Sequence, residues 1–294
     1  MEQFKKKEKL NTTKELYKNL TPLLNCIDFT VSNESYEVMN NNAYDMLVTS
    51  PVPEDLENYY LSEKYISHTD SKKTIFDRVY QIVKNHTLKQ KLKLINSFKT
   101  EEKTILDVGA GTGDFLKICK NNNWNVFGIE PSEKARNFAM DKNISLKENI
   151  NSYEGKQFDV ITLWHVLEHV PNLIEYTHQL KKLLKPNGVL LIAVPNYKSY
   201  DAKYYKEFWA AYDVPRHLWH FSKTAIKKIF TEVNMKVEKI LPMKFDAFYV
   251  SLLSEKYKSN KNKPVKAFIT GFTSNIKAKK NGEYSSLIYL IKNS

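Results

Sequence analysis

From about residue 103 onward, apolar residues occur at two different spacings along the chain. Short apolar runs at Thr104–Val108 and Phe158–Trp164 have the length of buried strands. Between them, apolar residues recur at helical spacing, as at Phe115, Leu116 and Ile118. Further strand-like runs lie at 125–130, 144–147 (a weak one), 189–194, 236–241 and 286–291. Strands that alternate with helices pair in parallel, so the pattern predicts an α/β, doubly wound sheet.

The regions on either side of this alternation have a different pattern. Residues 1–70 are polar and irregular, which predicts an N-terminal cap. The apolar spacing over about 71–98 predicts one long helix. Residues 241–282 separate the last two strands and have helical character, so we expect a helical lid rather than a structureless loop. The α/β domain would then comprise 71–240 together with 283–294.

The composition fits a globular protein in a reducing compartment. Of the 294 residues, 42% are hydrophobic and 13% are aromatic, which is enough for a sizeable core. No apolar run approaches the roughly 20 residues of a membrane span, and the basic N-terminus lacks the apolar segment of a signal peptide. Cys26 and Cys119 offer no disulfide framework. We therefore expect a cytoplasmic protein.

The positive charge of the chain suggests a nucleic-acid partner, but the scarcity of arginine argues against one. The net charge is +12, yet only Arg78, Arg136 and Arg216 are arginines. Proteins that recognise a nucleic-acid sequence rely mainly on arginine, whose guanidinium group binds phosphate and guanine through two hydrogen bonds. We expect no nucleic-acid partner.

Residues 251–294 carry nine lysines against Glu255 and Glu283. A solvated lysine surface is the main interpretation, with an acidic partner, an anionic membrane surface or an anionic substrate as alternatives.

A glycine loop follows the first strand of the sheet, in the stretch DVGAGTG at 107–113. Glycines let the backbone turn sharply and approach a ligand, and open α/β sheets bind ligands at this edge. Glu130 ends the second strand, where it can accept both hydroxyls of a ribose. The dinucleotide fingerprint would place a glycine at position 114, where this chain has an aspartate that would repel a pyrophosphate. S-adenosylmethionine has no phosphate and tolerates Asp107 and Asp114; a tight turn without a ligand is the alternative.

With these residues the chain resembles the class I S-adenosylmethionine-dependent methyltransferases, and more closely a bacterial branch with ubiquinone-type and sugar methyltransferases. The matching stretches are ILDVGAGTGDFL, VFGIEPS, FDVITLWHVLEHVPN, LLKPNGVLLIAVPN and YDVPRHLWHFS, in family order over about 100–240, and SSLIYLIK near the end. The resemblance implies a seven-stranded, mostly parallel sheet whose last strand inserts antiparallel. It also implies S-adenosylmethionine as cofactor, S-adenosylhomocysteine as product, and a small-molecule acceptor.

The resemblance also assigns residues to the cofactor. Glu130 would bind the ribose, Asn149 and Ile150 would lie near the adenine, and Trp164 and His165 near the methionine moiety. The whole expected set is Asp107, Gly109, Ala110, Gly111, Gly113, Glu130, Pro131, Asn149, Ile150, Trp164 and His165.

Close relatives often begin with a zinc ribbon built on two C-x-x-C pairs. Here the equivalent positions retain only Cys26, and one thiolate cannot hold a structural zinc. We expect a degenerate ribbon without metal. Tyr60, Tyr65 and His68 follow this region and are expected on the substrate side of the cleft, with ordinary packing as the alternative.

Residues 165–169 spell H-x-x-E-H, the ligand spacing of an inverted zinc-peptidase site. That site needs one continuous helix, whereas this motif directly follows a buried strand and precedes Pro171, so we expect a strand-to-helix junction and no metal.

In a methyltransferase, a hydroxyl or acidic-carbon acceptor needs a base. The expected catalytic residues are therefore His169, His217 and Glu168. A helix cap or a backbone hydrogen bond is the alternative for His169, and a buried structural hydrogen bond is the alternative for Glu168. A structural role is likewise the alternative for His220. Tyr65, His68, Tyr212, Arg216 and His220 are the expected substrate contacts. The main hypothesis is in-line methyl transfer to a small molecule. The alternatives are a catalytically silent scaffold with the same fold and, from the charge, a nucleic-acid methylase.

Overall fold

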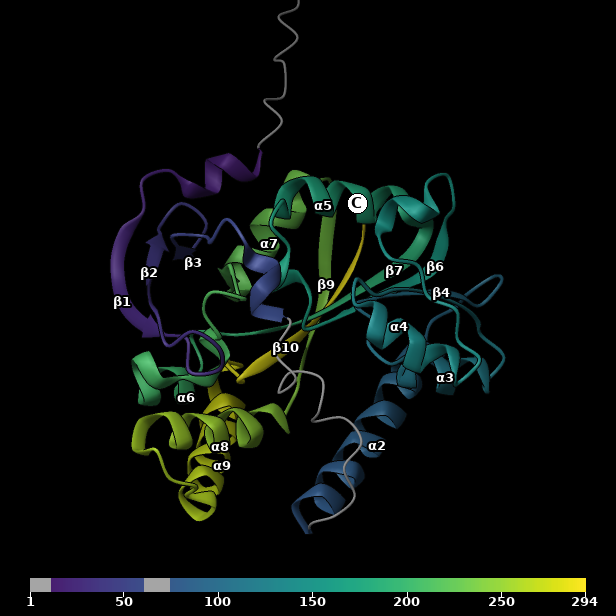
Figure 1. Ribbon diagram of the computed structural model, residues 1–294. Coiled ribbons are helices and arrows are strands. Elements are labelled where there is room, and N and C mark those ends of the chain that lie inside the picture. Colours follow the sequence, from purple (N-terminus) through teal and green to yellow (C-terminus); the bar gives the residue numbers. More distant parts are fainter. Residues whose placement is uncertain (1–11, 61–74) are drawn as a thin grey trace, which may run out of the picture.

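The computed structural model describes residues 12–60 and 75–294, which form two sheets with helices around them (Figure 1). Tyr65 and His68, two of the expected substrate contacts, lie outside the described residues. The central sheet has six strands in the order β5-β4-β6-β7-β10-β9. These are β4 (Thr104–Val108), β5 (Asn125–Ile129), β6 (Phe158–Trp164), β7 (Leu184–Pro195), β9 (Met235–Pro242) and β10 (Ser286–Asn293).

The pairing of the strands confirms the predicted α/β class. β4 pairs in parallel with β5 and β6, and β6 pairs in parallel with β7. The final strand β10 inserts between β7 and β9 and runs antiparallel to both. The predicted count of seven strands was too high by one. Residues 144–147 form a single bridge between Lys147 and Ile129, because only Ile144 and Leu146 are apolar there and the chain turns away after two hydrogen bonds.

Helices cover both faces of the central sheet. Neighbouring residues of one strand point to opposite faces, so Leu106 and Ile161 belong to one apolar cluster while Ile105 and Val160 belong to another. The first cluster includes residues of α5 (Leu173–Leu183) and α7 (Lys223–Glu232); the second includes residues of α2 (Ile75–Asn96), α3 (Asp114–Lys120) and α4 (Glu133–Met140). Strand β6, which is buried except at Trp164, is the centre of this arrangement.

A second, four-stranded sheet is built from the N-terminal region and one short segment from far downstream. Strands β1 (Thr21–Ile27), β2 (Ser35–Asn41) and β3 (Met46–Ser50) pair antiparallel, and β8 (Trp219–His220) adds to β3. The one-turn helices η1 (Thr13–Tyr17) and η2 (Leu56–Tyr60) flank this sheet. Because β8 belongs to the segment expected at the substrate, the N-terminal sheet is tied directly to the site.

The remaining helices lie around the ends of β6, β7 and β9. Four short turns precede or follow them: η3 (Ile150–Tyr153), η4 (Leu167–His169), η5 (Lys206–Phe208) and η6 (Ala210–Tyr212). α6 (Tyr200–Tyr205) follows β7, while α8 (Asp246–Ser259) and α9 (Pro264–Asn281) occupy the region predicted to be helical, and pack on each other near α6 (Figure 1). Their role as a lid stays a prediction. Within the described chain, no helix is long and apolar enough to cross a bilayer.

Candidate active site

The glycine loop sits where β4 ends, as the sequence predicts. Gly109, Gly111 and Gly113 all have positive φ, of 69°, 54° and 73°, a conformation that glycine adopts without steric cost. The amide of Gly111 donates to Oε2 of Glu130 at 2.8 Å, and the amide of Ser132 donates to Oε1 at 2.9 Å. A Cβ atom built on Gly111 would meet no atom within 4 Å. The loop therefore faces open space next to a carboxylate that the backbone holds in place.

The two aspartates of the loop have different environments. Asp107 is buried, accepts a hydrogen bond from Thr162 Oγ1 at 2.5 Å, and burial raises its pKa to about 7. Its carboxyl group is thus turned toward β6. Asp114 pairs with Lys142 at 2.6 Å and Lys84 at 2.7 Å, so its charge at the start of α3 is offset. Both carboxylates are thus engaged by neighbouring side chains.

The other expected cofactor residues are distributed along the carboxyl edge of the sheet. Pro131 is exposed next to Glu130. Asn149 is exposed and precedes η3, where Ile150 is buried. Trp164 ends β6 and meets Phe115 edge to face, with Lys91 Nζ 4.1 Å above the Trp164 ring. Burial lowers the pKa of Lys91 to about 8.

The H-x-x-E-H motif begins at a sharp turn directly after β6. His165 has a φ of 57°, which is uncommon for a residue other than glycine. Its Nδ1 lies 3.2 Å from Glu168 Oε1, and its Nε2 lies 3.0 Å from Asp246 Oδ2 on α8. Burial alone would lower the pKa of His165, but hydrogen bonds and charge from Asp246 and Glu168 outweigh it and raise the pKa to about 10. His165 is therefore a cation between two carboxylates and is unsuited to act as a base.

The second half of the motif lies on η4, a 3-10 turn, so the predicted strand-to-helix junction is present. Glu168 is completely buried, and its Oε2 has no hydrogen-bond partner in the described chain. Burial would raise the pKa of Glu168, but His165 and the nearby histidines outweigh burial and lower it. Glu168 is thus a buried carboxylate with one unused acceptor oxygen.

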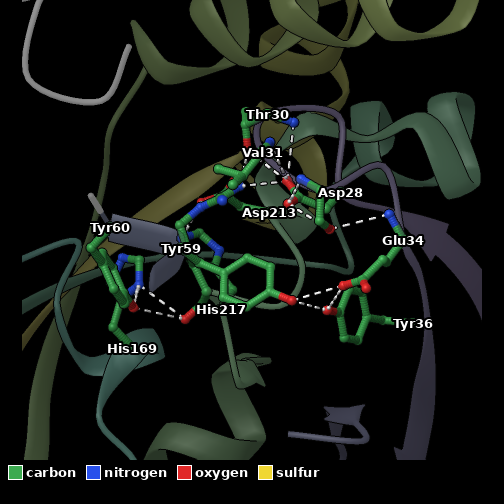
Figure 2. Close-up of polar contacts among 12 residues, drawn as sticks. Asp28, Thr30, Val31, Glu34, Tyr36, Tyr59, Tyr60, His169, Asp213 and His217 are labelled. Carbon is green, nitrogen blue, oxygen red and sulfur yellow. Dashed lines mark hydrogen bonds and ion pairs between the residues drawn. The ribbon is translucent and has the colours of Figure 1, made fainter. Parts of the chain in front are cut away.

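His169 and His217 meet beside the Glu168 carboxylate. Nδ1 of His169 lies 3.1 Å from the carbonyl of Arg216, and Nδ1 of His217 lies 2.9 Å from the carbonyl of Ala211. A carbonyl can only accept, so both Nδ1 atoms carry the proton and both Nε2 atoms keep a lone pair when the rings are neutral. Tyr60 also contacts His169 Nδ1, at 3.0 Å (Figure 2). Burial and the charge of His217 lower the pKa of His169 to about 4.

We call Glu168, His169 and His217 the histidine cluster. One ligand atom from each lies within 4.8 Å of the other two, so the three together have the composition of a two-histidine, one-carboxylate metal site. The same three groups also have the composition of a proton-transfer site. The sequence brought all three forward as catalytic candidates, and the structure places them side by side.

Arg216 lies next to the cluster but is committed to other partners. It is 2% exposed and pairs with Asp213 at 2.6 Å and Asp28 at 3.2 Å, and it also donates to Thr30 Oγ1. The Asp28 side chain meanwhile accepts backbone hydrogen bonds from Thr30 through Ser32 (Figure 2). These contacts favour a structural role that joins the N-terminal sheet to the site, in place of the substrate contact expected from the sequence.

Tyr212 and His220 are packed as well. Tyr212 is 5% exposed between Trp209 and His220, and Nε2 of His220 lies 3.0 Å from Thr49 Oγ1 on β3. The Thr49 hydroxyl donates to the carbonyl of His217, so His220 is the donor of the pair. Burial lowers the pKa of His220 to about 3. The assignment of these side chains to the substrate stays a prediction.

Sequence reasoning missed two residues of the site. Asp213 lies three positions before Arg216 and four positions before His217. Residues at these spacings contact each other on a helical turn, so the spacing could have indicated Asp213 as their partner. Asp246 lies 81 positions after its partner His165, and a contact between segments so far apart has no local signal.

The fold and the site together define a Rossmann-like α/β protein with a glycine loop, an acid after the second strand and an antiparallel final strand. A family model described as "Methyltransferase domain" matches residues 80–240. The chain belongs to this methyltransferase-domain family.

Two relatives and one solved structure give the scale of the similarity. The chain is 32% identical over 124 residues to a ubiquinone biosynthesis O-methyltransferase of Hydrogenovibrio crunogenus. The matched region covers 37% of this chain and 51% of the relative. It is 28% identical over 193 residues to the enzyme of the same name from Rickettsia bellii, with 60% and 80% covered.

The magnesium protoporphyrin IX methyltransferase of Synechocystis PCC 6803 has the same fold, with a TM-score of 0.51, 13% identity, and 81% and 94% covered. The chain spans about half the length of several of the curated relatives that it matches.

Proposed function

We propose that the protein transfers a methyl group from S-adenosylmethionine to a hydroxyl of a small-molecule acceptor. The observation that carries this proposal is the arrangement along one sheet edge: the glycine loop with Glu130 at the ends of β4 and β5, and the histidine cluster beyond the end of β6. Family membership supports the cofactor, and the names of the relatives support an oxygen acceptor.

The residues at the loop fit an adenosine better than a phosphate. Glu130 offers carboxylate oxygens to ribose hydroxyls while the Gly111 and Ser132 amides hold it in place. The positive φ of Gly111 explains why this position needs glycine, and the open space beside it is free for a ligand. When bound, the cofactor supplies an electrophilic methyl group on a sulfonium.

The histidine cluster would then receive the proton of the acceptor. A lone-pair Nε2 of the cluster would take the hydroxyl proton, so that the acceptor oxygen could receive the methyl group and S-adenosylhomocysteine would be the other product. His169 is our first candidate, because it is half-buried, whereas His217 is 8% exposed. The Glu168 carboxylate would stabilise the imidazolium that forms.

We assign proton transfer to this cluster in place of metal binding. Glu168 already engages His165 through Oε1, and the motif lies on a 3-10 turn, so it lacks the continuous helix of a zinc peptidase. In-line methyl transfer needs no Lewis acid, since alignment supplies much of the rate acceleration. A catalytically silent scaffold, the alternative considered from the sequence, receives no support from the relatives, which are named as enzymes.

A turnover experiment tests the proposal. The protein is incubated with S-adenosylmethionine and fractionated small-molecule extracts, and S-adenosylhomocysteine is quantified by mass spectrometry. We expect a fraction that gives turnover with the native protein and not with His169→Asn. Cofactor binding without turnover in any fraction would favour the silent scaffold.

A further inference from the structure

Helix α9 turns a row of large apolar side chains to the outside. Val265, Phe268, Ile269, Phe272 and Ile276 are 72, 61, 58, 52 and 44% exposed, respectively. Their spacing places all five on one face of the helix. We call this row the α9 stripe. An exposed apolar face of this size marks an interaction surface, because isolated exposed apolar residues are common but contiguous ones are not.

The opposite face of α9 packs against the rest of the protein, so the stripe must face outward. That face consists of small residues, namely Ala267, Thr270, Gly271, Ser274 and Ala278, and all five are buried. Gly271 packs so closely that a Cβ atom there would come within 2.8 Å of the Ala247 carbonyl on α8. Ser274 donates to the buried Asp201 on α6 at 2.6 Å. The small face cannot exchange places with the stripe, so the stripe belongs outside in the folded protein.

Lysines surround the stripe, and acids are missing from the same segment. Eight lysines and no aspartate or glutamate lie between Lys256 and Lys280. All eight are exposed. Lys256, Lys258, Lys261 and Lys263 lie at or before the start of α9, Lys266 lies in its first turn, and Lys277, Lys279 and Lys280 lie in its last turns. The apolar stripe is therefore bordered by positive charge at both ends.

We propose that the α8–α9 hairpin is a docking surface for an anionic lipid bilayer, with the α9 stripe in the acyl–headgroup boundary and the lysines on the phosphates. An amphipathic helix binds a membrane in this way, and each lysine near an anionic leaflet contributes about 1 kcal/mol. The helix lies in the interface plane and does not span the bilayer.

The charge of the lysines and the exposed apolar residues argue against two other occupants. A second copy of this chain, docked stripe to stripe, would bring sixteen lysines together, twice the eight of one chain, and like charges repel. A nucleic acid would match the lysines but would leave five large apolar side chains against phosphates and water.

The hairpin is also connected to the candidate active site. Asp246, the first residue of α8, is the partner of His165. Because α8 packs along α9, docking of the hairpin would connect the bilayer surface to the candidate active site. Membrane binding itself needs no cofactor and can be measured without it.

Vesicle co-sedimentation tests the proposal on the full chain. At low ionic strength we expect the protein to pellet with vesicles of phosphatidylcholine and phosphatidylglycerol, and to stay in solution with phosphatidylcholine alone. The double variant F268S/F272S removes two exposed rings, and K279E/K280E reverses two charges. Each should weaken the partition coefficient at least about tenfold, which corresponds to 1.4 kcal/mol.

Matched variants control for exposure and charge elsewhere. F138S/M140S changes two exposed apolar residues of α4, and K134E/K227E makes the same charge change on α4 and α7. Both should bind vesicles like the native protein. Native binding by F268S/F272S would overturn the proposal, as would absence of binding to anionic vesicles. A dimer by light scattering that F268S/F272S abolishes, without vesicle binding, would assign the stripe to a second copy instead.

Discussion

His169 and His217 meet edge to face, with ring centroids 4.5 Å apart, and each is held through Nδ1 by a backbone carbonyl. Each Nε2 atom therefore keeps its lone pair when its ring is neutral, and the two rings lie next to the buried carboxylate of Glu168. This arrangement places the lone pair of His169 Nε2 where the acceptor molecule is proposed to bind.

His169→Asn keeps a polar side chain and removes the lone-pair nitrogen that we assign as base. We expect turnover to fall by about 10²–10⁴-fold, the usual contribution of a general base. The affinity for S-adenosylhomocysteine should stay unchanged, because His169 is not assigned to the cofactor. His178→Asn on α5 is the matched control and should behave like the native protein. Equal loss of turnover and of cofactor affinity would contradict the assignment.

The depressed pKa of His169 predicts a wide acid limit. Its folded pKa of about 4 lies below the usual 6.5, so the base stays neutral, and competent, until the pH falls to about 4. The same depression makes folding stability fall as the pH drops from 6.5 toward 4, because the unfolded chain then binds the additional proton. A rate profile with an acid-limb pKa near 6.5, in protein shown by circular dichroism to be folded, would contradict this.

His165 makes the opposite contribution to stability. Its pKa is raised to about 10, so its stabilising effect is complete below pH 6.5 and is lost as the pH rises toward 10. We expect His165→Gln to lower the urea midpoint at pH 6.5 and to lower it much less above pH 10. Urea titrations of both proteins at the two pH values measure this difference. The same deficit at both values would mean that His165 is not charged in the native protein.

Arg216→Ala distinguishes a structural role from a substrate role. Removal of the guanidinium leaves Asp28, which is 1% exposed, without its ion partner, so we expect a loss of about 3–5 kcal/mol in the free energy of unfolding. Chemical denaturation measures it. Native stability together with a raised KM for the acceptor would support the substrate contact expected from the sequence.

Gly111→Ala tests the open side of the glycine loop. Gly155 also has a positive φ, and a Cβ atom placed on it would likewise meet no atom within 4 Å, so both alanines meet similar backbone strain of about 1–2 kcal/mol. Only Gly111 lies at the proposed cofactor site. We therefore expect similar losses of stability for the two variants, but a weaker affinity for S-adenosylhomocysteine in Gly111→Ala alone. Equal affinities would place the cofactor elsewhere.

The sequence predicted the central sheet well because its strands are short, apolar and separated by helical spacing. The glycine loop and Glu130 could be located because the turn after a parallel strand has a local chemical pattern. The prediction of a strand at 144–147 was wrong because two apolar residues do not sustain a ladder of backbone hydrogen bonds. The packing of Arg216 and His220 could not be predicted, since their partners Asp28 and Thr49 lie more than 160 positions away and reach them only when β8 joins the N-terminal sheet.

Isothermal titration with S-adenosylhomocysteine tests the central claim most directly. The native protein should bind it, and Glu130→Ala should lose most of that affinity, because the ribose loses its acceptor. Glu133→Ala, an exposed acid three positions later at the start of α4, should bind like the native protein. Absence of binding to native protein that is shown to be folded, or equal binding by the native protein and Glu130→Ala, would contradict the account.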